Sequence, residues 1–270
     1  MNNLTFTINQ DTYTYRLVGQ GEVIALFHGF TSTQNTWNKL VAELSEKYQV
    51  LTIDLPGHGE TRIKQGKTMR HFSDDFKALL DELKINKIHL LGYSMGGRTA
   101  LSFAHYYPQM IQSLILESAS PGIADIDLKR QRQVADKALA ENIQTKGIES
   151  FVNDWEDLPL FKTQKKLPLP VQNQIRKERL SQSPFGLAKS LIYMGTGTQE
   201  SLWNELENID FPLTLIVGSE DVKFIEINKQ INELYKAAKL YTIKKAGHCV
   251  HLEQEAKFIQ VVHKHLQEMS

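Results

Sequence analysis

The feature that most constrains the fold of this chain is the segment Gly92-Tyr93-Ser94-Met95-Gly96, a Gly-x-Ser-x-Gly motif. The short apolar run at 87–91 predicts a buried strand before the motif, and residues 95–107 have the pattern of a helix after it. A turn sharp enough to lift the Ser94 hydroxyl clear of the backbone forces this serine into a strained conformation. The residues two before and two after Ser94 then crowd each other, so glycine is what fits at both positions. The segment therefore predicts an exposed serine nucleophile on a strand–turn–helix unit.

Strands and helices alternate along most of the chain, which is typical of a mostly parallel sheet covered by helices on both faces. The predicted fold class is therefore α/β, with eight strands, of which the first two form an antiparallel pair joined by a turn. We expect the strands at residues 4–9, 12–17, 22–27, 49–54, 87–91, 112–117, 212–218 and 240–244. We expect helices between them at residues 37–47, 69–83, 95–107, 224–237 and 254–267.

The alternation lapses in residues 123–208, where the sequence predicts helices without strands. A helical insertion of this length is typical of a cap laid over the edge of a sheet. We therefore predict a core formed by residues 1–122 and 209–270, with a helical cap formed by residues 123–208 inserted in it. The expected cap helices span residues 127–142, 147–155, 170–181, 185–194 and 201–206, and a Pro-rich loop is expected at 165–170.

The composition indicates an ordinary globular protein. The chain has 270 residues, 41% of them hydrophobic and 23% charged, and Lys+Arg and Asp+Glu both number 31. A formal charge of zero argues against a nucleic-acid partner or an anionic membrane surface. The sole cysteine, Cys249, cannot form an intramolecular disulfide. Because there is also no signal-peptide pattern and no apolar run of membrane-spanning length, we expect a cytoplasmic protein without membrane insertion.

Three predicted strand ends carry the residue types of a nucleophile triad, in the order Ser94, Asp221, His248. Loops at the carboxyl ends of parallel strands converge on one crevice, so these three side chains are expected to meet. His248 would take the Ser94 proton, and Asp221 would hold the imidazole in the right tautomer and stabilise the imidazolium. We therefore propose Ser94, Asp221 and His248 as the catalytic residues.

Each member of this triad has an alternative interpretation. Glu220 competes with Asp221 for the acid role, and we favour Asp221 because Gly-x-x-Asp is the usual spacing after such a strand. Asp221 could instead cap the following helix. His248 could be an ordinary loop histidine, and His251 is one of its rivals.

An oxyanion hole needs two backbone N–H groups aimed at a developing negative oxygen. The Met95 N–H, just after the nucleophile and at a helix N-terminus, is one candidate. The Phe30 N–H, from the segment His28-Gly29-Phe30 after the third strand, is the other. The alternative for His28-Gly29 is a simple tight turn.

Several arginines fall near the predicted crevice: Arg98 lies four residues after Ser94, and Arg130, Arg132, Arg176 and Arg179 lie on predicted cap helices. Arginine pairs with a carboxylate through two parallel hydrogen bonds, so this set suits a substrate with several carboxylates. The alternative is that the cap arginines are solvated surface charges. We see no metal-ligand spacing and no phosphate-binding glycine loop, and we expect no cofactor.

Four segments together resemble the α/β-hydrolase superfamily over essentially the whole chain. They are His28-Gly29-Phe30, residues 54–59, residues 92–97 and Ala246-Gly247-His248. Within the segment 54–59 we interpret His58 as a structural turn residue. The superfamily includes esterases, dehalogenases, peroxidases, C–C hydrolases and lyases, so the fold alone does not define the reaction. A serine rather than an aspartate at position 94 disfavours a dehalogenase.

Further segments resemble the 2-succinyl-6-hydroxy-2,4-cyclohexadiene-1-carboxylate synthases, the pyruvate-eliminating lyases of menaquinone biosynthesis. They are residues 92–98, 117–122, 154–161 and 218–224, together with Arg132 four residues before Asp136. The resemblance implies a small polycarboxylate substrate, from which the triad would abstract a ring proton to trigger 2,5-elimination of pyruvate. The substrate-binding residues that it implies are Tyr93, Arg98, Arg132, Trp155 and Arg179.

The chain departs from this family's pattern at Ser118-Ala119-Ser120 and at the Pro-rich loop 165–170. Trp155 and Phe161 could simply pack the cap. Two other functions stay open at this point. One is a serine hydrolase, either a carboxylesterase or a C–C bond hydrolase, acting on a small acidic substrate. The other is a non-catalytic binding protein that kept the fold.

Overall fold

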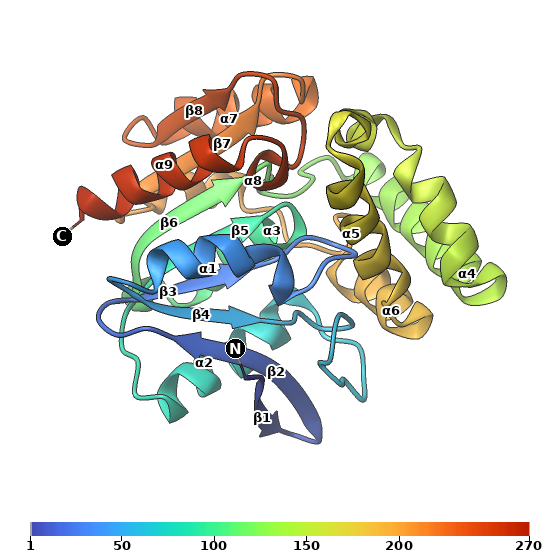
Figure 1. The fold of residues 1–270 in the computed structure, drawn as a ribbon, viewed down its shortest axis with the longest axis horizontal. Coiled ribbons are helices and arrows are strands. Elements are labelled where there is room, and N and C mark those ends of the chain that lie inside the picture. The colour runs from blue at the N-terminus through green and yellow to red at the C-terminus, as the bar shows by residue number, and fades with distance from the viewer. Residues whose placement is uncertain (1, 270) are drawn as a thin grey trace.

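The computed structural model describes residues 2–269, which form an α/β structure around an eight-stranded sheet (Figure 1). The strand order is β1-β2-β4-β3-β5-β6-β7-β8; β1 pairs with β2 and β2 with β4 antiparallel, and the other pairs are parallel. The prediction of a mostly parallel eight-stranded sheet is therefore confirmed. The strands are β1 (Leu4–Ile8), β2 (Asp11–Val18), β3 (Val23–Phe27), β4 (Gln49–Ile53), β5 (Ile88–Tyr93), β6 (Ile111–Glu117), β7 (Leu213–Gly218) and β8 (Lys239–Ile243).

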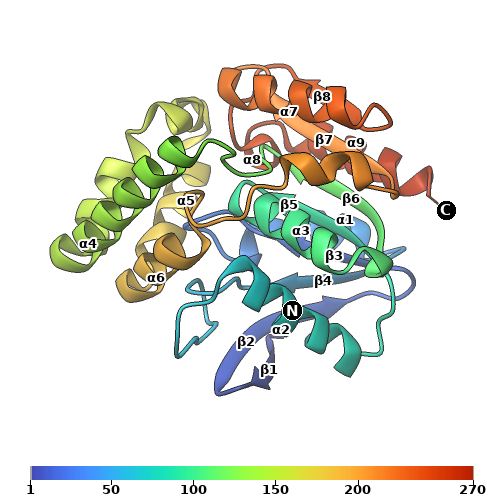
Figure 2. The ribbon, with the colours of Figure 1, turned by 180° about the vertical axis from the view of Figure 1, so that it is seen from behind.

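Helices cover both faces of the sheet (Figures 1 and 2). One face packs against α1 (Asn38–Leu44), α8 (Val250–Glu253) and α9 (Glu255–Gln267). The other face packs against α2 (Met69–Glu82), α3 (Met95–Tyr106) and α7 (Val222–Leu234). Short 3-10 helices are η1 (Gln34–Trp37), η2 (Pro108–Met110) and η4 (Trp203–Asn208).

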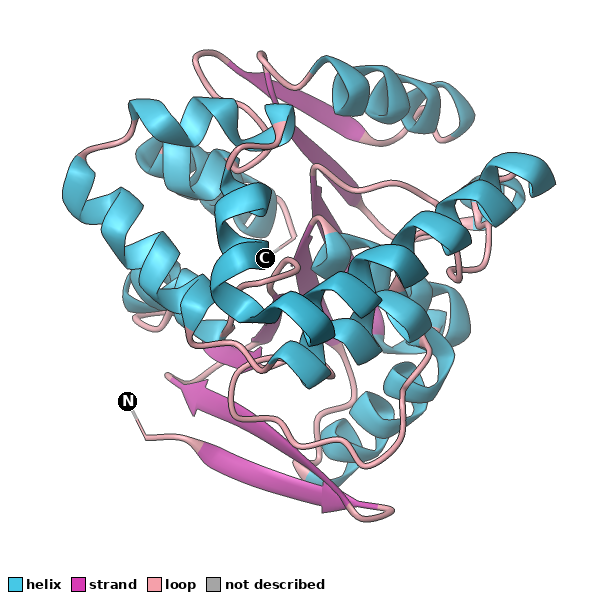
Figure 3. Cartoon of the chain, turned by 90° about the vertical axis from the view of Figure 1, so that its right-hand side faces the viewer, coloured by secondary structure: helices cyan, strands magenta, loops and turns pink. Residues whose placement is uncertain are grey.

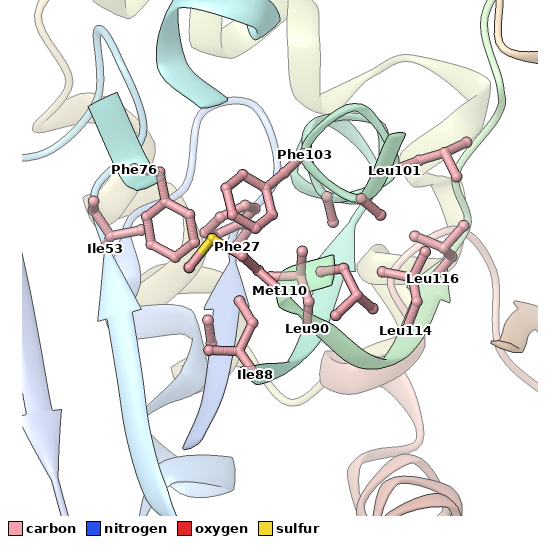
Figure 4. Packing of buried hydrophobic residues seen from close by; sticks show 14 of the residues in the cluster. Phe27, Ile53, Phe76, Ile88, Leu90, Leu101, Phe103, Met110, Leu114 and Leu116 are labelled. Atoms are coloured by element: carbon pink, nitrogen blue, oxygen red, sulfur yellow. The ribbon is translucent and has the colours of Figure 1, made fainter. Parts of the chain in front are cut away.

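The central strands are buried on both faces because side chains alternate along them. In β3, Ala25 and Phe27 belong to the hydrophobic cluster under α2 and α3, whereas Ile24 and Leu26 belong to the cluster under α1 and α9. In the first cluster, the Phe76 ring lies 4.9 Å from the Phe27 ring and 5.0 Å from the Phe103 ring, both edge-on (Figure 4). Phe103 lies near the end of α3, so this packing holds α3, the helix that follows the Ser94 turn, against the sheet.

A helical segment joins β6 to β7 and lies beside the sheet (Figures 1 and 3). It contains α4 (Ile126–Glu156), η3 (Pro159–Lys166), α5 (Leu169–Leu180) and α6 (Pro184–Met194), and η4 lies at its end. Its own hydrophobic cluster includes Ile143, Phe151 and Leu187. We call residues 123–208 the cap. The division of the chain into a core and a cap at these boundaries stays a prediction.

Of two local expectations for the cap, one is confirmed and one needs correction. The helices predicted at 127–142 and 147–155 are the two arms of α4, which meet at Gly147, where a φ of 82° and a ψ of 172° break the helical backbone. The loop predicted at 165–170 is shorter than expected, since η3 ends at Lys166 and α5 begins at Leu169. Pro170 lies in the first turn of α5, where a proline costs no hydrogen bond. Within residues 2–269, no helix has the length and apolar character needed to cross a membrane.

Candidate active site

Ser94 occupies the turn between β5 and α3 with φ 51° and ψ −109°, a conformation that L residues rarely adopt. A Cβ on Gly92 would lie 2.3 Å from the Gly96 carbonyl oxygen, and a Cβ on Gly96 would lie 2.2 Å from the Phe27 carbonyl oxygen. Backbone atoms occupy both positions, so neither glycine can be replaced without moving the turn. This confirms the steric reason for the motif and explains how the serine is held out from the backbone.

Ser94, His248 and Asp221 form one hydrogen-bonded chain. The His248 Nε2 atom lies 2.9 Å from Ser94 Oγ, and His248 Nδ1 lies 2.7 Å from Asp221 Oδ2. The His248 and Asp221 side chains are buried. An imidazole that donates through Nδ1 to a carboxylate keeps Nε2 free to accept the serine proton. The geometry is that of a nucleophile or base activated through an oriented histidine.

The residues that were alternatives for these roles, Glu220 and His251, make other contacts in the structure. Glu220 pairs with Lys166 at the surface, at 2.8 Å. Asp221 stands at the N-cap position of α7, but its side chain makes no capping hydrogen bond there. His251 bonds to the Glu117 carboxylate at 2.9 Å rather than to Ser94.

A buried ion pair, formed by Glu117 and His251, lies close to the hydrogen-bonded chain of Ser94, His248 and Asp221. The Glu117 carboxylate, at the end of β6, accepts from both the backbone N–H and the ring Nδ1 of His251, and the His251 Nε2 contacts Thr36 Oγ1 at 2.9 Å. Although burial opposes the imidazolium, the neighbouring Cys249 and Glu117 raise the pKa of His251 well above its usual value. The pair ties the segment that follows His248 to the sheet.

The two predicted oxyanion donors come from different elements of the fold. Met95 is the first residue of α3, where the helix dipole favours negative charge. Phe30 lies in the loop after β3, and its ring packs edge-on against Trp155 of the cap at 5.4 Å. Both residues and Ser94 line the same cavity.

That cavity, which we call the Ser94 cavity, has a volume of about 380 Å³ and lies between core and cap. It brings together the predicted residues Tyr93, Arg98, Arg132 and Trp155 with Ser94 and His248. No group of three or more His, Cys, Asp or Glu side chains suited to hold a metal ion occurs within residues 2–269.

Two arginines supply positive charge to the Ser94 cavity. Arg98 donates to the Met194 carbonyl at 2.9 Å and to Gln199 Oε1 at 3.1 Å. Burial, and next the charge of Arg132, lower the pKa of Arg98 to about 9, which leaves it charged at neutral pH. Arg132 donates through Nε to Asp136 at 2.7 Å.

The structure does not bring Arg179 into the Ser94 cavity. Arg179 lines a neighbouring cavity of about 380 Å³, which shares the side chains of Phe30, Tyr93 and Phe161 with the first. Its guanidinium lies 5.0 Å from the centre of the Phe161 ring and donates to Gln164 at 2.9 Å.

The other two cap arginines are also outside the Ser94 cavity. Arg130 is exposed and lies 3.6 Å from Asp127, whereas Arg176 pairs with Glu156 at 2.6 Å. The alternative of a solvated surface charge therefore describes Arg130, whereas Arg176 is partly buried and held in an ion pair.

Among the residues that line the Ser94 cavity, sequence reasoning did not assign a role to Lys223 and Phe224. The Phe224 ring lies 4.6 Å from the His248 ring and covers one side of it. Lys223 adds a further positive charge. Lys223 and Phe224 follow Asp221 by two and three residues. This spacing could have indicated them, because the start of a helix next to a predicted acid must face the same crevice.

Comparison with known proteins gives a consistent result. Residues 22–255 match the family model described as alpha/beta hydrolase fold. A protein of Bacillus subtilis (strain 168), provisionally named 2-succinyl-6-hydroxy-2,4-cyclohexadiene-1-carboxylate synthase, is 39% identical over 270 residues, 97% of each chain. The 2-succinyl-6-hydroxy-2,4-cyclohexadiene-1-carboxylate synthase of Klebsiella pneumoniae (strain ATCC 700721 / MGH 78578) is 29% identical over 87% of this chain and 90% of its own.

Solved structures agree with this. MenH from S. aureus superposes with a TM-score of 0.91 at 38% identity, covering 94% of this chain and 98% of its own. An esterase from Thermogutta terrifontis, described as malate bound, has a TM-score of 0.86 over 100% of this chain and 99% of its own. At 24% identity, the esterase supports the fold alone.

The buried Glu117–His251 pair leads to a stability prediction. Glu117→Gln removes the carboxylate that stabilises the buried imidazolium, and at pH 6 we expect the free energy of unfolding to fall by about 3 kcal/mol. Because the pKa of His251 is raised in the folded protein, the contribution of the pair is present below the unfolded pKa of 6.5 and is lost as the pH rises through the folded value. Urea unfolding of both proteins from pH 6 to pH 10 measures the difference.

This difference should shrink steadily as the pH increases. Equal stability at pH 6, or a difference that stays constant across the pH range, would show that the pair is not charged in the folded protein.

Proposed function

The chain belongs to the α/β hydrolase fold family, and we propose that it is a lyase of this family. The reaction is elimination of pyruvate from 2-succinyl-5-enolpyruvyl-6-hydroxy-3-cyclohexene-1-carboxylate, which gives 2-succinyl-6-hydroxy-2,4-cyclohexadiene-1-carboxylate in menaquinone biosynthesis. Likeness to named synthases over the whole chain supports this assignment. The observation that carries it is that a Ser94–His248 pair opens into a cavity which also contains Arg98 and Arg132.

The reaction requires a base at the ring carbon that bears the succinyl group, whose C–H bond is acidified by the adjacent carbonyl. In our proposal Ser94 Oγ takes this proton while its own hydroxyl proton passes to His248 Nε2, and Asp221 stabilises the imidazolium. The C–H electrons shift through the ring, and the C–O bond to the enolpyruvyl group breaks. The leaving enolpyruvate takes the proton from His248 and becomes pyruvate, so Ser94 forms no acyl bond.

Negative charge builds on the succinyl carbonyl oxygen as the ring proton leaves. We assign the N–H groups of Phe30 and Met95 to that oxygen, because both residues border the cavity beside Ser94. The start of α3 adds its dipole at Met95. Donors aimed at a charge that exists only in the transition state lower the barrier without strengthening substrate binding equally.

The carboxylates of the substrate need cationic partners. We propose Arg98 and Arg132 for this role, together with Lys223, which also lines the cavity. A guanidinium forms two parallel hydrogen bonds with a carboxylate, and it does so best away from bulk water. A plain ester substrate would offer these guanidinium groups no carboxylate, and Asp136, the partner of Arg132, would be the acidic group that they face.

Tyr93, Trp155 and Arg179 complete the proposed binding residues. Trp155 lines the Ser94 cavity, and Tyr93 lines both this cavity and its neighbour. The Phe161 ring is shared by the two cavities. Arg179 could contact the substrate only if the substrate extended past this ring or if the cap moved. We therefore propose it as a contact for the most distant carboxylate.

Regarding partners and location, we propose a small polycarboxylate as the substrate and no nucleic-acid partner, consistent with the equal numbers of acidic and basic residues. We also propose a cytoplasmic location. The only cysteine, Cys249, is buried as a free thiol, which suits a reducing compartment.

The direct test is to generate the enolpyruvyl substrate in situ, add the protein and follow pyruvate with a lactate dehydrogenase couple. We expect rapid release that disappears in Ser94→Ala, because the variant lacks the proposed base. If release does not exceed the background rate, the lyase proposal is wrong. The same triad would then be tested as a serine hydrolase, with a burst of product from a p-nitrophenyl ester as the supporting result.

A second prediction concerns Arg98. In Arg98→Gln the shorter amide keeps some hydrogen-bonding capacity toward the cap but loses the charge. Losing a hydrogen bond to a charged group costs about 1.5–3 kcal/mol, so KM for the enolpyruvyl substrate should rise about 10- to 100-fold with a smaller change in kcat.

The matched control for Arg98→Gln is Arg176→Gln. Arg176 is a cap arginine that pairs with Glu156 and Asn153 outside the Ser94 cavity, and we expect its KM to stay near that of the wild type. An unchanged KM in Arg98→Gln, or an equal rise in both variants, would contradict the assignment of Arg98 as a carboxylate partner.

A further inference from the structure

The loop that carries Phe30, residues 28–34, follows β3 and depends on hydrogen bonds from outside itself. Thr31, next to Phe30, has φ 69°, in the left-handed region that a β-branched residue adopts only where its surroundings hold it. The direction of the Phe30 N–H therefore depends on the groups to which the loop backbone is bonded.

Two of these groups belong to the core. His58 Nε2 accepts from the Thr31 N–H at 3.2 Å, and Asp54 Oδ1 accepts from the Gln34 N–H at 2.8 Å. Burial, and next the charge of His28, lower the pKa of His58 to about 3, so its ring stays neutral and its Nε2 remains an acceptor. Both contacts come from the segment after β4, and neither involves the cap.

The middle of the loop is held by the cap. Glu178, near the end of α5, points one carboxylate oxygen, Oε1, at the loop. This oxygen accepts from the Thr33 N–H at 2.8 Å, from the Thr33 hydroxyl, and from the Ser32 hydroxyl at 3.4 Å. Hydrogen bonds to a carboxylate are about twice as strong as neutral ones, which makes this contact a strong link between cap and loop.

The residue next to Glu178 reaches the other side of the site. Arg179 lies over the Phe161 ring, and Phe161 in turn lies 6.3 Å from the His248 ring, edge-on. One turn of α5 thus contacts the Phe30 loop through Glu178 and the wall of the Ser94 cavity through Arg179. A movement of α5 changes both contacts together.

Glu178 does not line the Ser94 cavity; it lines the neighbouring one. Its effect on the reaction must therefore pass through the loop. We propose that Glu178 is a positioning residue that aims the Phe30 N–H at the substrate oxygen, so that the oxyanion hole is complete only when the cap is docked on the core. This inference rests on the proposed function, because it assumes that the Phe30 N–H stabilises the developing oxyanion.

Loss of the Glu178 link should affect kcat and KM differently. A misplacement of about 1 Å in a catalytic group can cost about 100-fold in rate. The contacts that Arg98 and Arg132 make with the substrate in its ground state would be little affected. Loss of the Glu178 link should therefore lower kcat and leave KM close to the wild-type value.

The experiment uses three substitutions at one position. Glu178→Ala removes the acceptor. Glu178→Gln keeps a neutral oxygen acceptor at the same reach, and Glu178→Asp keeps the charge but withdraws it by one methylene. Glu149→Ala, at an exposed glutamate of α4, is the control for loss of a cap carboxylate. Each protein is assayed for pyruvate release, and amide hydrogen exchange of residues 28–34 is followed by mass spectrometry without substrate.

We expect Glu178→Ala to lower kcat by about 10- to 100-fold with KM within about threefold, and to speed exchange in the loop. Glu178→Gln should be intermediate in both readouts, because its neutral oxygen accepts the same hydrogen bonds more weakly than a carboxylate does, and Glu149→Ala should change neither. If Glu178→Ala fails to fold, Glu178→Asp decides the question, because its kcat and loop protection should both fall.

Three results would overturn the inference: unchanged loop exchange in the Ala or Asp variant, a raised KM with an unchanged kcat, or a Gln variant as impaired as the Ala variant. Failure of the proposed function looks different, since the wild type would then release no pyruvate while the exchange data still reported on the link. If the wild type releases pyruvate normally and Glu178→Ala has the same kcat and loop exchange, this inference is wrong and the proposed function stands.

Discussion

The arrangement of the site depends on one steric constraint, the space available where β5 turns into α3. Ser94 sits at φ 51° because the Gly92 and Gly96 backbones pass too close to each other for any side chain. The same close approach brings Gly96 against the carbonyl of Phe27, at the end of the neighbouring strand. The serine, the start of α3 and the loop after β3 are therefore placed by one set of backbone contacts, which the rings packed around Phe27 and Phe103 hold in position.

The elements that could be predicted from the sequence are those set by local pattern and strand order. Ser94, Asp221 and His248 follow three separate strands, and parallel strands must deliver such residues to one edge, so their meeting could be expected without knowing any distance. Contacts that depend on how the cap docks could not be expected in this way. Nothing in the helical pattern around Glu178 and Arg179 indicates which of the two faces the Phe30 loop or which cavity receives the guanidinium.

The difference between a lyase and a hydrolase lies in what surrounds the same three residues. A histidine-activated serine beside two N–H donors can attack a carbonyl carbon or remove a neighbouring proton, and the substrate's position decides between them. Positive charge from Arg98 and Arg132, on the side of the cavity formed with the cap, would hold a carboxylated ring so that a C–H bond, rather than an ester carbon, faces Ser94. In this account Arg98 of the core helix α3 and Arg132 of the cap together supply the selectivity, and the triad of the core supplies the proton transfer.

The central claim is that Ser94 acts as a base on a ring C–H bond. The most direct measurement compares single-turnover pyruvate release from substrate carrying hydrogen or deuterium at the ring carbon that bears the succinyl group, with the intact mass of the protein recorded during turnover. The account predicts a primary isotope effect on pyruvate release and no covalent adduct on Ser94. Equal rates for the two substrates, together with a mass increase that disappears in Ser94→Ala, would contradict it and identify Ser94 as a nucleophile.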